Sequence, residues 1–333
     1  MKTFPTLVRV ALACVLVAGC GKPQAPSTQA DAAKTLKIAV IPKGTTHEFW
    51  KSVHAGAVKA ERELKGVQTI WKGPTKEDDR AAQITVVEDF ISQKVDGIVL
   101  APLDDKALAK PVAEAAQMGI PVVIIDSGLQ GKDFASFVAT DNYNGGCIAA
   151  ERMGKLLGGK GDLLVLRYQE GSASTAKREQ GFLDTIAKKF PGIKIVSSNQ
   201  YAGATTETAY KAAENLLNRF AKLDGIFCPN ESSTFGMLRA LQDAKRAGKL
   251  TFVGFDSSEK LVEALRAGEL HGLVLQNPVN MGYLGVKTMV QHIRGAKVAP
   301  RIDTGAVLVT KENMDTPEMK LLHSPDLSQW LGK

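Results

Sequence analysis

Several hallmarks of common protein classes are missing from this 333-residue sequence. No apolar run reaches the roughly 20 residues that a membrane-spanning helix needs. The charged residues are mixed in sign along the chain without a basic block, so the net charge of +7 does not indicate nucleic acid binding. No cluster of histidine or cysteine has the spacing of metal ligands, and we therefore expect no metal or other cofactor.

Motifs of catalysis are missing as well. No nucleophile–base pair, phosphate-binding loop or Gly-x-Gly-x-x-Gly fingerprint stands out. The glycine-rich run from Gly158 to Gly161 connects a predicted helix to a predicted strand and is typical of a turn. We therefore do not expect an enzyme.

Cysteine is scarce, with four residues in the whole chain. Cys14 and Cys20 lie near the start, which leaves Cys147 and Cys228 for the body of the protein. One disulfide between them is an option in an oxidising compartment. We favour the alternative of two free, buried thiols that pack as small apolar side chains.

The first 19 residues predict a secretory signal peptide and not a part of the fold. Lys2 and Arg9 are the only charges there, and the run from Val10 to Gly19 is small and apolar. The five residues Leu-Val-Ala-Gly-Cys that end at Cys20 resemble the lipobox of bacterial lipoproteins, in which the cysteine is acylated and becomes the new N-terminus. We therefore predict lipidation at Cys20. The alternative is an ordinary signal peptide with an incidental cysteine.

Residues 20–35 predict a flexible tether, because they contain two prolines and show no apolar periodicity. A lipid anchor followed by a tether implies a body that is held near a membrane, in the periplasm or at the cell surface.

From Leu36 onward, short apolar runs alternate with segments of helical periodicity, which predicts parallel sheets covered by helices on both faces. Strands are predicted at 36–41, 67–71, 97–101, 122–126 and 137–140, and then at 162–166, 193–197, 225–228, 251–255 and 272–276. Apolar stripes predict two helices within 49–64 and 84–91, and others at about 106–118, 143–157, 175–189, 206–219, 233–247, 259–267 and 281–294.

The second series of strands repeats the first. The sequence therefore predicts an α/β fold of two similar, doubly wound, parallel-sheet lobes. No single connector is rich in glycine and proline, so we expect several short crossings between the lobes and not one linker.

Polar side chains follow many of the predicted strands. They are Lys43, Asp126, Ser127, Asn230, Asp256 and Gln276. Because ligands bind at the carboxyl ends of the strands in open α/β sheets, two facing lobes would bring these residues into one cleft.

The residue types in this set suit a polyhydroxylated ligand. Carboxylates accept hydrogen bonds from vicinal hydroxyl groups, and the Arg178 guanidinium donates through a rigid fork. Phe49, Trp50 and Trp71 offer flat surfaces for the C–H faces of a sugar ring. Neighbours on a helix point about 100° apart, and Phe49 fits the apolar stripe better, so Trp50 is the stronger ligand candidate.

Each of these residues also has a structural alternative. Asp126 and Asp256 could cap the segments that follow them, and Asn230 could hold a turn. His47 and Glu48 could be a capping pair. The prediction therefore depends on the joint pattern at the strand ends and not on one residue.

A known family shares several of these segments in the same order. They are Ile38–Ile41 with Phe49-Trp50, Val95–Pro102, Gly119–Asp126, Thr140–Gly146, Arg178–Phe182, Gly225–Glu231, Val253–Asp256 and Leu275–Pro278. With them, the chain from Leu36 to about Val309 resembles the periplasmic sugar-binding proteins of ABC transporters, of the ribose-binding type.

The resemblance implies a type I periplasmic binding protein, whose two lobes are joined by a three-crossover hinge with the sugar between them. The N-terminal lobe would comprise residues 36–140 and 277–306, and the C-terminal lobe 141–276 and 307–325. By matched position, Phe49 and Trp50 would stack on the sugar, and the polar contacts would come from Asp126, Arg178, Asn230, Asp256 and Gln276.

The chain departs from the family's pattern at four positions in the expected site. His47 and Ala101 stand where the family often has Asn, and Ser127 stands where Arg is common. Lys43 replaces a small polar residue, and Ile41–Lys43 is closer to a subgroup with rhamnose-binding and autoinducer-2-binding proteins. These departures leave the identity of the sugar open.

The implied function is that of a substrate-binding lipoprotein of an ABC importer. It would capture a pentose, hexose or deoxyhexose as a monomer and deliver it to permease subunits in the membrane. The alternative is a binding protein that presents autoinducer-2 or a sugar to a membrane signalling receptor. Transcription regulators of the Lac repressor type share the fold, but here a leader and tether occupy the place of their helix-turn-helix.

Overall fold

The structure is a computed structural model that describes residues 34–332. The predicted signal peptide, Cys14, Cys20 and nearly all of the tether lie outside the described residues. Within residues 34–332, no helix combines the length and the apolar character that crossing a bilayer would require.

Six strands form the first sheet, in the order β11-β5-β4-β3-β1-β2. All five neighbouring pairs are parallel. The strands are β1 (Leu36–Ile41), β2 (Val67–Trp71), β3 (Gly97–Leu100), β4 (Val122–Ile125), β5 (Ser136–Ala139) and β11 (Arg301–Asp303).

The second sheet repeats this arrangement, in the order β12-β10-β9-β8-β6-β7. Its strands are β6 (Lys160–Arg167), β7 (Gly192–Tyr201), β8 (Gly225–Phe227), β9 (Thr251–Phe255), β10 (Gly272–Leu275) and β12 (Val307–Val309). The edge strand β12 runs antiparallel to β10, so this sheet is not purely parallel as the sequence predicts.

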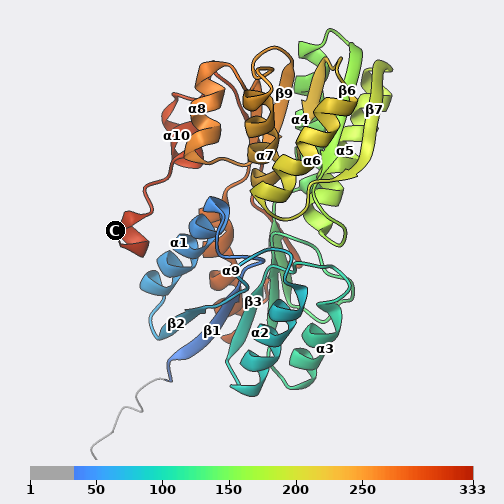
Figure 1. The fold of residues 1–333 in the computed structure, drawn as a ribbon. Helices are drawn as coiled ribbons and strands as arrows, with labels where there is room; N and C mark the ends of the chain where they lie inside the picture. The colour runs from blue at the N-terminus through green and yellow to red at the C-terminus, as the bar shows by residue number, and fades with distance from the viewer. Residues whose placement is uncertain (1–33, 333) are drawn as a thin grey trace, which may run out of the picture. The chain divides into compact units, whose positions relative to one another are not determined.

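The chain passes between the two sheets three times, after β5, after β10 and between β11 and β12. We call the part built on the first sheet the N-terminal lobe and the part built on the second the C-terminal lobe (Figure 1).

Helices cover both faces of each sheet. In the N-terminal lobe, α1 (Glu48–Glu63) and α9 (Pro278–Ile293) pack on one face, and α2 (Arg80–Ser92) and α3 (Ala109–Gln117) on the other. In the C-terminal lobe, α4 (Asn142–Leu156) and α5 (Ala173–Lys189) pack opposite α6 (Thr206–Arg219), α7 (Glu231–Asp243) and α8 (Glu259–Ala267).

Strand β1 shows why the central strands are apolar throughout. Ile38 and Val40 face the core under α1 and α9, whereas Ala39 and Ile41 face the core under α2 and α3. Because successive side chains of a strand point to opposite faces, a sheet that is covered on both sides needs apolar residues at every position.

Paired helices approach closely in both lobes because glycine stands at the contact. A Cβ atom on Gly282 of α9 would lie 2.0 Å from the carbonyl oxygen of Val53 on α1. A Cβ atom on Gly146 of α4 would lie 2.0 Å from the carbonyl oxygen of Arg178 on α5. The close approach at Gly146 therefore sets the position of the α5 backbone that bears Arg178.

The C-terminal segment contacts both lobes. Helix α10 (Pro317–His323) belongs to the C-terminal lobe, where His323 Nε2 lies 2.9 Å from the carbonyl oxygen of Met314. Helix α11 (Ser328–Leu331) lies against α1, and Arg62 donates to the carbonyl oxygens of Gln329 and Trp330 at 2.5 and 3.0 Å. The sequence pattern predicts neither helix.

All of the predicted strands and helices are present, five of them (β1, β2, β9, α6 and α8) with the predicted bounds. The short strands β11 and β12 escape the pattern, because three residues are too few to show a period and β11 carries the charged Arg301 and Asp303. Cys147 and Cys228 are both free thiols, as favoured, but only Cys228 is buried and Cys147 is half-buried.

One buried amide connects the fold to the loop after β1. Gln83 of α2 is fully buried, and its Nε2 donates to the carbonyl oxygens of Pro42 and Ala101 at 2.9 and 2.8 Å. Its Oε1 accepts from the backbone N–H of Leu103 at 2.8 Å. This side chain therefore holds the loops that follow β1 and β3, at the edge where Lys43 lies.

Replacing Gln83 by leucine keeps the shape and leaves three buried backbone groups without partners. Each such group costs about 1–3 kcal/mol, so we expect Gln83→Leu to lower the free energy of unfolding by at least about 3 kcal/mol. Urea unfolding followed by circular dichroism measures this change. The control is Gln291→Leu at an exposed glutamine of α9, which should leave the midpoint nearly unchanged. An unaltered midpoint in Gln83→Leu would contradict the expectation.

Candidate functional site

A small cavity of about 30 Å³ lies between the two lobes, at the carboxyl ends of the parallel strands. We call it the interlobe cavity. Eight of the nine residues predicted as ligand-binding line it, namely Lys43, Phe49, Trp50, Asp126, Arg178, Asn230, Asp256 and Gln276. The ninth, Ser127, is buried beside it, and its Oγ accepts from the backbone N–H of the lining residue Ser174 at 3.1 Å. A direct contact of each with a ligand stays a prediction.

The two aspartates occupy equivalent places in the two lobes. Asp126 follows β4 and Asp256 follows β9, and both have left-handed backbone conformations, with φ of 59° and 64°. Few residues other than glycine take this conformation, and aspartate is one of them. Neither is the N-cap of the helix that follows it, since Asp141 caps α4 and Ser258 caps α8, so the interpretation that they cap the following segments is wrong. Oδ2 of Asp256 instead accepts from the backbone N–H of Glu231, the first residue of α7, at 3.2 Å.

Lys43 is paired within its own lobe and also reaches the other one. Its Nζ lies 2.8 Å from Oδ2 of Asp126, and both side chains are buried. The same ammonium donates to the hydroxyl groups of Ser174 and Ser172 on the C-terminal lobe, at 3.1 and 3.5 Å. The buried charge of Lys43 is therefore balanced by one carboxylate and stabilised by hydroxyls from across the cleft.

Arg178 is the largest fully buried polar side chain of the site. Its Nε donates to Oδ1 of Asn142 at 2.8 Å, and its Nη1 donates to the carbonyl oxygen of Pro229 at 2.9 Å. Its guanidinium also stacks on the ring of Phe255, 4.0 Å from the ring centre. The second terminal nitrogen, Nη2, is buried and has no hydrogen-bond partner in the described part of the chain.

Asp256 links Arg178 to Gln276. Its Oδ2 lies 3.7 Å from Nη1 of Arg178, and its Oδ1 accepts from Nε2 of Gln276 at 2.8 Å. Burial raises the pKa of Asp256 above its usual range, and the attraction of Arg178 opposes this shift. Oε1 of Gln276 is buried and, among residues 34–332, has no partner. The unpaired donor and the unpaired acceptor thus belong to two residues that both line the interlobe cavity.

The sequence pattern predicts that Phe49 faces the core and Trp50 faces the ligand, and the structure differs from this prediction. Trp50 is the more deeply buried ring, with 2% of its surface exposed, and packs in the core under α1. Phe49 is half-buried and meets Trp50 edge-on, with the ring centres 4.9 Å apart. Both rings nevertheless line the interlobe cavity. Trp71 stacks on His54 instead and is not part of the cavity wall.

Asn230 has a structural role, which is to cap a helix and not to hold a turn, and it also lines the cavity. It is the N-cap of α7, and its Oδ1 accepts from the backbone N–H of Ser233 at 3.3 Å. Its Nδ2 donates to the hydroxyl of Ser232 at 3.1 Å. Asn230 therefore fixes the start of α7 at the cavity wall.

Six further residues line the cavity, namely His47, Glu77, Tyr168, Ser174, Thr175 and Glu231. Among them, only His47 is placed in the expected site by the sequence, as a departure from the family pattern. Tyr168 comes directly after β6. The pattern of site residues at strand ends therefore includes it once β6 is known to end at Arg167. Glu77 has no such signal, because it lies in the charged run Lys76–Arg80, which is typical of a solvated loop.

Glu231 brings a carboxylate of the C-terminal lobe to the first turn of α1. Its two oxygens accept from the backbone N–H groups of Glu48 and Phe49, at 3.3 and 3.1 Å. The N-cap of α1, His47, makes no capping bond of its own, so the alternative of His47 and Glu48 as a capping pair is wrong. Burial raises the pKa of Glu231 to about 7.

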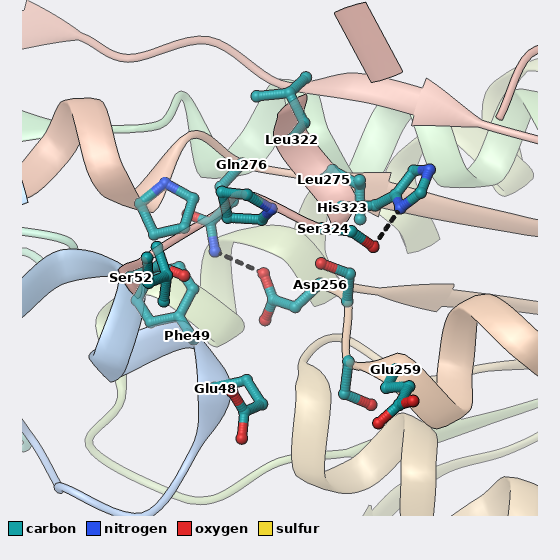
Figure 2. Close-up of a pocket in the computed structure, with 15 residues that line it drawn as sticks. Glu48, Phe49, Ser52, Asp256, Glu259, Leu275, Gln276, Leu322, His323 and Ser324 are labelled. Carbon is teal, nitrogen blue, oxygen red and sulfur yellow. Dashed lines mark hydrogen bonds between the residues drawn. The ribbon is translucent and has the colours of Figure 1, made fainter. Parts of the chain in front are cut away.

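A larger depression of about 360 Å³ adjoins the interlobe cavity and shares Phe49, Asp256 and Gln276 with it. Figure 2 shows the hydrogen bond between Gln276 and Asp256 at this depression, with Leu322 and His323 of the C-terminal segment on its wall. Side chains of both lobes and of the C-terminal segment thus meet beside the site.

No group of three or more histidine, cysteine, aspartate or glutamate side chains within residues 34–332 is placed to hold a metal ion. The polar side chains of the site are paired with one another or directed at the cavity. Two similar lobes with a buried polar site between them define a two-lobed binding protein of the type I periplasmic class.

Comparison with known proteins gives the same class. Residues 38–297 match the family model described as periplasmic binding protein domain, and the chain belongs to this family. It is 31% identical over 282 residues to the D-allose-binding periplasmic protein of Escherichia coli (strain K12), which covers 82% of this chain and 89% of the relative.

Solved structures extend the comparison to the fold. A carbohydrate transporter solute-binding protein from Agrobacterium radiobacter, in complex with D-arabinose, is 38% identical with a TM-score of 0.83, covering 87% of this chain and 99% of that one. An ABC transporter solute-binding protein from Agrobacterium vitis with bound D-fucose is 39% identical with a TM-score of 0.83, covering 86% and 99%. The family resemblance and the two-lobed fold expected from the sequence are confirmed.

The buried pair of Lys43 and Asp126 allows a test of the site's electrostatics. Removing one partner of a buried ion pair costs about 3–5 kcal/mol, because the other charge is left buried without compensation. We expect Lys43→Met to lower the free energy of unfolding by about 3 kcal/mol, and the double variant Lys43→Met/Asp126→Asn to recover most of the loss. Urea unfolding of the two single variants and the double variant completes the cycle. Equal stability of Lys43→Met and the double variant would show that the pair is not coupled.

Proposed function

We propose that this protein binds a monosaccharide between its lobes, without converting it, and delivers it to the permease of an ABC importer. One observation carries the proposal. Nη2 of Arg178 and Oε1 of Gln276 are buried on either side of Asp256, and neither has a partner within residues 34–332. Buried polar atoms are almost always paired, and a sugar hydroxyl both donates and accepts, so a sugar can pair with both.

The size of the interlobe cavity supports a closing motion. A space of about 30 Å³ has room for no more than one or two water molecules. A monosaccharide can therefore enter only when the lobes separate, which breaks the bonds from Lys43 to Ser174 and from Glu231 to α1. A ligand that contacts both lobes stabilises only the closed form, and this differential affinity drives closure.

The comparisons favour a pentose, hexose or deoxyhexose. The similar structures from Agrobacterium hold D-arabinose and D-fucose, and the similar protein of Escherichia coli is named for D-allose. These three sugars are the first candidates for this chain. A thermal-shift screen with them tests binding, because a true ligand raises the apparent stability in proportion to the logarithm of its concentration.

Asp256 provides the sharpest test of the sugar site. Its removal leaves the amide of Gln276 and the backbone N–H of Glu231 without their acceptor, at a cost of about 1–3 kcal/mol for each group, and takes a carboxylate away from the buried charge of Arg178. We expect Asp256→Ala to weaken binding of the sugar found in the screen by at least about 30-fold, measured by isothermal titration calorimetry. The control Asp315→Ala removes an exposed carboxylate of the same lobe, which pairs with Arg266 at 2.8 Å, and should leave the affinity unchanged. An unchanged affinity in Asp256→Ala would refute the assignment.

We also propose that the mature protein is a lipoprotein anchored through Cys20. The support comes from the sequence alone, in which the small residues and Cys20 end a short apolar run.

Metabolic labelling with a radioactive fatty acid tests this anchor in the full-length protein. We expect label and membrane sedimentation in the wild type and in the control Cys14→Ser, and loss of both in Cys20→Ser. Label that persists in Cys20→Ser would disprove lipidation at this residue.

A further inference from the structure

Glu77 has bonds to both lobes, although it lies outside the strand-end pattern. Its Oε1 accepts from Nε1 of Trp50 at 2.6 Å and lies 2.6 Å from Nδ1 of His47. Its Oε2 accepts from the hydroxyl of Tyr168 at 2.5 Å. Its backbone carbonyl accepts from Nε2 of Gln169 at 3.0 Å. One carboxylate oxygen is therefore held by the N-terminal lobe and the other by the C-terminal lobe.

The geometry of Glu77 acts on two residues of the cavity wall. An indole has a single N–H donor, so the bond from Trp50 to Glu77 fixes the plane of that ring. A bond at Nδ1 of His47 fixes the imidazole and leaves Nε2 as its second polar atom. Both rings line the interlobe cavity, whereas the carboxylate of Glu77 is occupied by protein donors.

The charges around the pair keep both members ionised. Burial alone would lower the pKa of His47, but Glu77 outweighs it and raises this pKa to about 9, with help from Glu231 and Asp256. Burial alone would raise the pKa of Glu77, but His47 outweighs it, aided by Lys43 and the Tyr168 hydroxyl, and the pKa falls to about 2.

The pH range follows from the signs of these shifts. The raised pKa of His47 contributes stability that is complete below about pH 6.5 and is lost as the pH rises through about 9. The lowered pKa of Glu77 contributes stability above about pH 4.5 that is lost as the pH falls to about 2. Between these limits, His47 is a cation with two N–H donors.

We propose that Glu77 is a positioning residue, which on closure of the lobes holds the Trp50 ring and a protonated His47 in place for the ligand. Its bonds to Trp50 and His47 lie within one lobe, and its bond to Tyr168 exists only when the lobes meet. Glu77 therefore connects closure of the lobes to the positions of Trp50 and His47 in the wall of the interlobe cavity. The ligand part of this inference rests on the proposed sugar binding.

Two substitutions separate the roles of Glu77. Glu77→Gln keeps the size of the side chain and removes its charge, so burial is left as the main influence on His47 and makes it neutral near pH 7. Tyr168→Phe removes only the bond across the cleft and leaves the pair of Glu77 and His47 intact. The control Glu61→Gln removes a carboxylate of α1 that accepts from the backbone N–H of Thr69 and is not part of the cavity wall.

The first measurement needs no ligand. Titration of the His47 ring by NMR should give a pKa of about 9 in the wild type and in Glu61→Gln, and below 6.5 in Glu77→Gln. The His47 signal is assigned by its absence in His47→Gln. A His47 that titrates alike in the wild type and in Glu77→Gln would overturn the proposal, whether or not any sugar binds.

The second measurement is the pH dependence of affinity, by calorimetry with D-arabinose, D-allose and D-fucose. The wild type is the reference at each pH, because Glu231, whose pKa is raised to about 7, lines the same cavity and titrates in every variant. The ratio of Kd in Glu77→Gln to Kd in the wild type should rise at least about tenfold from pH 5 to pH 8, as His47 loses its proton. The same ratio for Tyr168→Phe should be about 5 to 10 at every pH in this range. A wild-type profile in Glu77→Gln would overturn the proposal, whereas failure of all three sugars to bind the wild type counts against the sugar site alone.

If Glu77→Gln does not fold, Tyr168→Phe decides the question. An unchanged Kd in Tyr168→Phe would then refute the proposal that Glu77 couples closure to the positions of Trp50 and His47. The predicted weakening of binding without a pH dependence would support it.

Discussion

Charges that become buried when two lobes meet must be paired, and this constraint connects the fold to its site. Lys43, Arg178 and Asp256 are each almost fully buried. In an open form, water hydrates them at little cost, whereas in the closed form every unpaired donor or acceptor loses that hydration. The protein satisfies most of these groups itself but leaves one nitrogen of Arg178 and one oxygen of Gln276 without partners in the described chain. Under the proposed function, we expect a bound ligand to supply these missing hydrogen bonds.

The repeated fold explains why the site has aspartates on both sides. Asp126 and Asp256 follow the corresponding strands β4 and β9, with the same left-handed backbone. A second pair of equivalent aspartates is structural. Asp96 accepts from the backbone N–H of Lys37 at 2.8 Å, and Asp224 accepts from that of Asp162 at 2.7 Å. One pair stabilises the amino ends of the sheets, and the other faces the cavity at their carboxyl ends. The aspartates before the strands are therefore structural, and the aspartates after the strands belong to the site.

The sequence predicts those site residues that lie at the carboxyl ends of the strands. Lys43, Asp126, Asp256 and Gln276 come directly after apolar runs, and parallel pairing brings such ends together. Glu77 could not be found in this way, because its burial depends on contacts with residues up to 92 positions away and its local sequence is typical of a solvated loop. The sequence also does not predict which of Phe49 and Trp50 is more deeply buried. Helical periodicity gives the direction in which each ring points, but not how much of the other lobe covers it. Apolar periodicity therefore predicts the strands and helices of each lobe better than it predicts the contacts between the lobes.

The polar character of the interlobe contacts matters for a binding cycle. Several sets of bonds cross the cleft, among them those between Lys43 or Ser127 and Ser174, between Glu77 and Tyr168, and between Glu231 and the start of α1. A neutral bond contributes only about 0.5–1.5 kcal/mol, and one with a charged partner about 1.5–3 kcal/mol, because water replaces the lost partner when the lobes separate. An apolar contact of the same area would favour closure with or without ligand, at about 25 cal/mol per Å². Polar contacts instead keep the open and closed forms close in free energy, so that a few hydrogen bonds from a bound ligand decide between them.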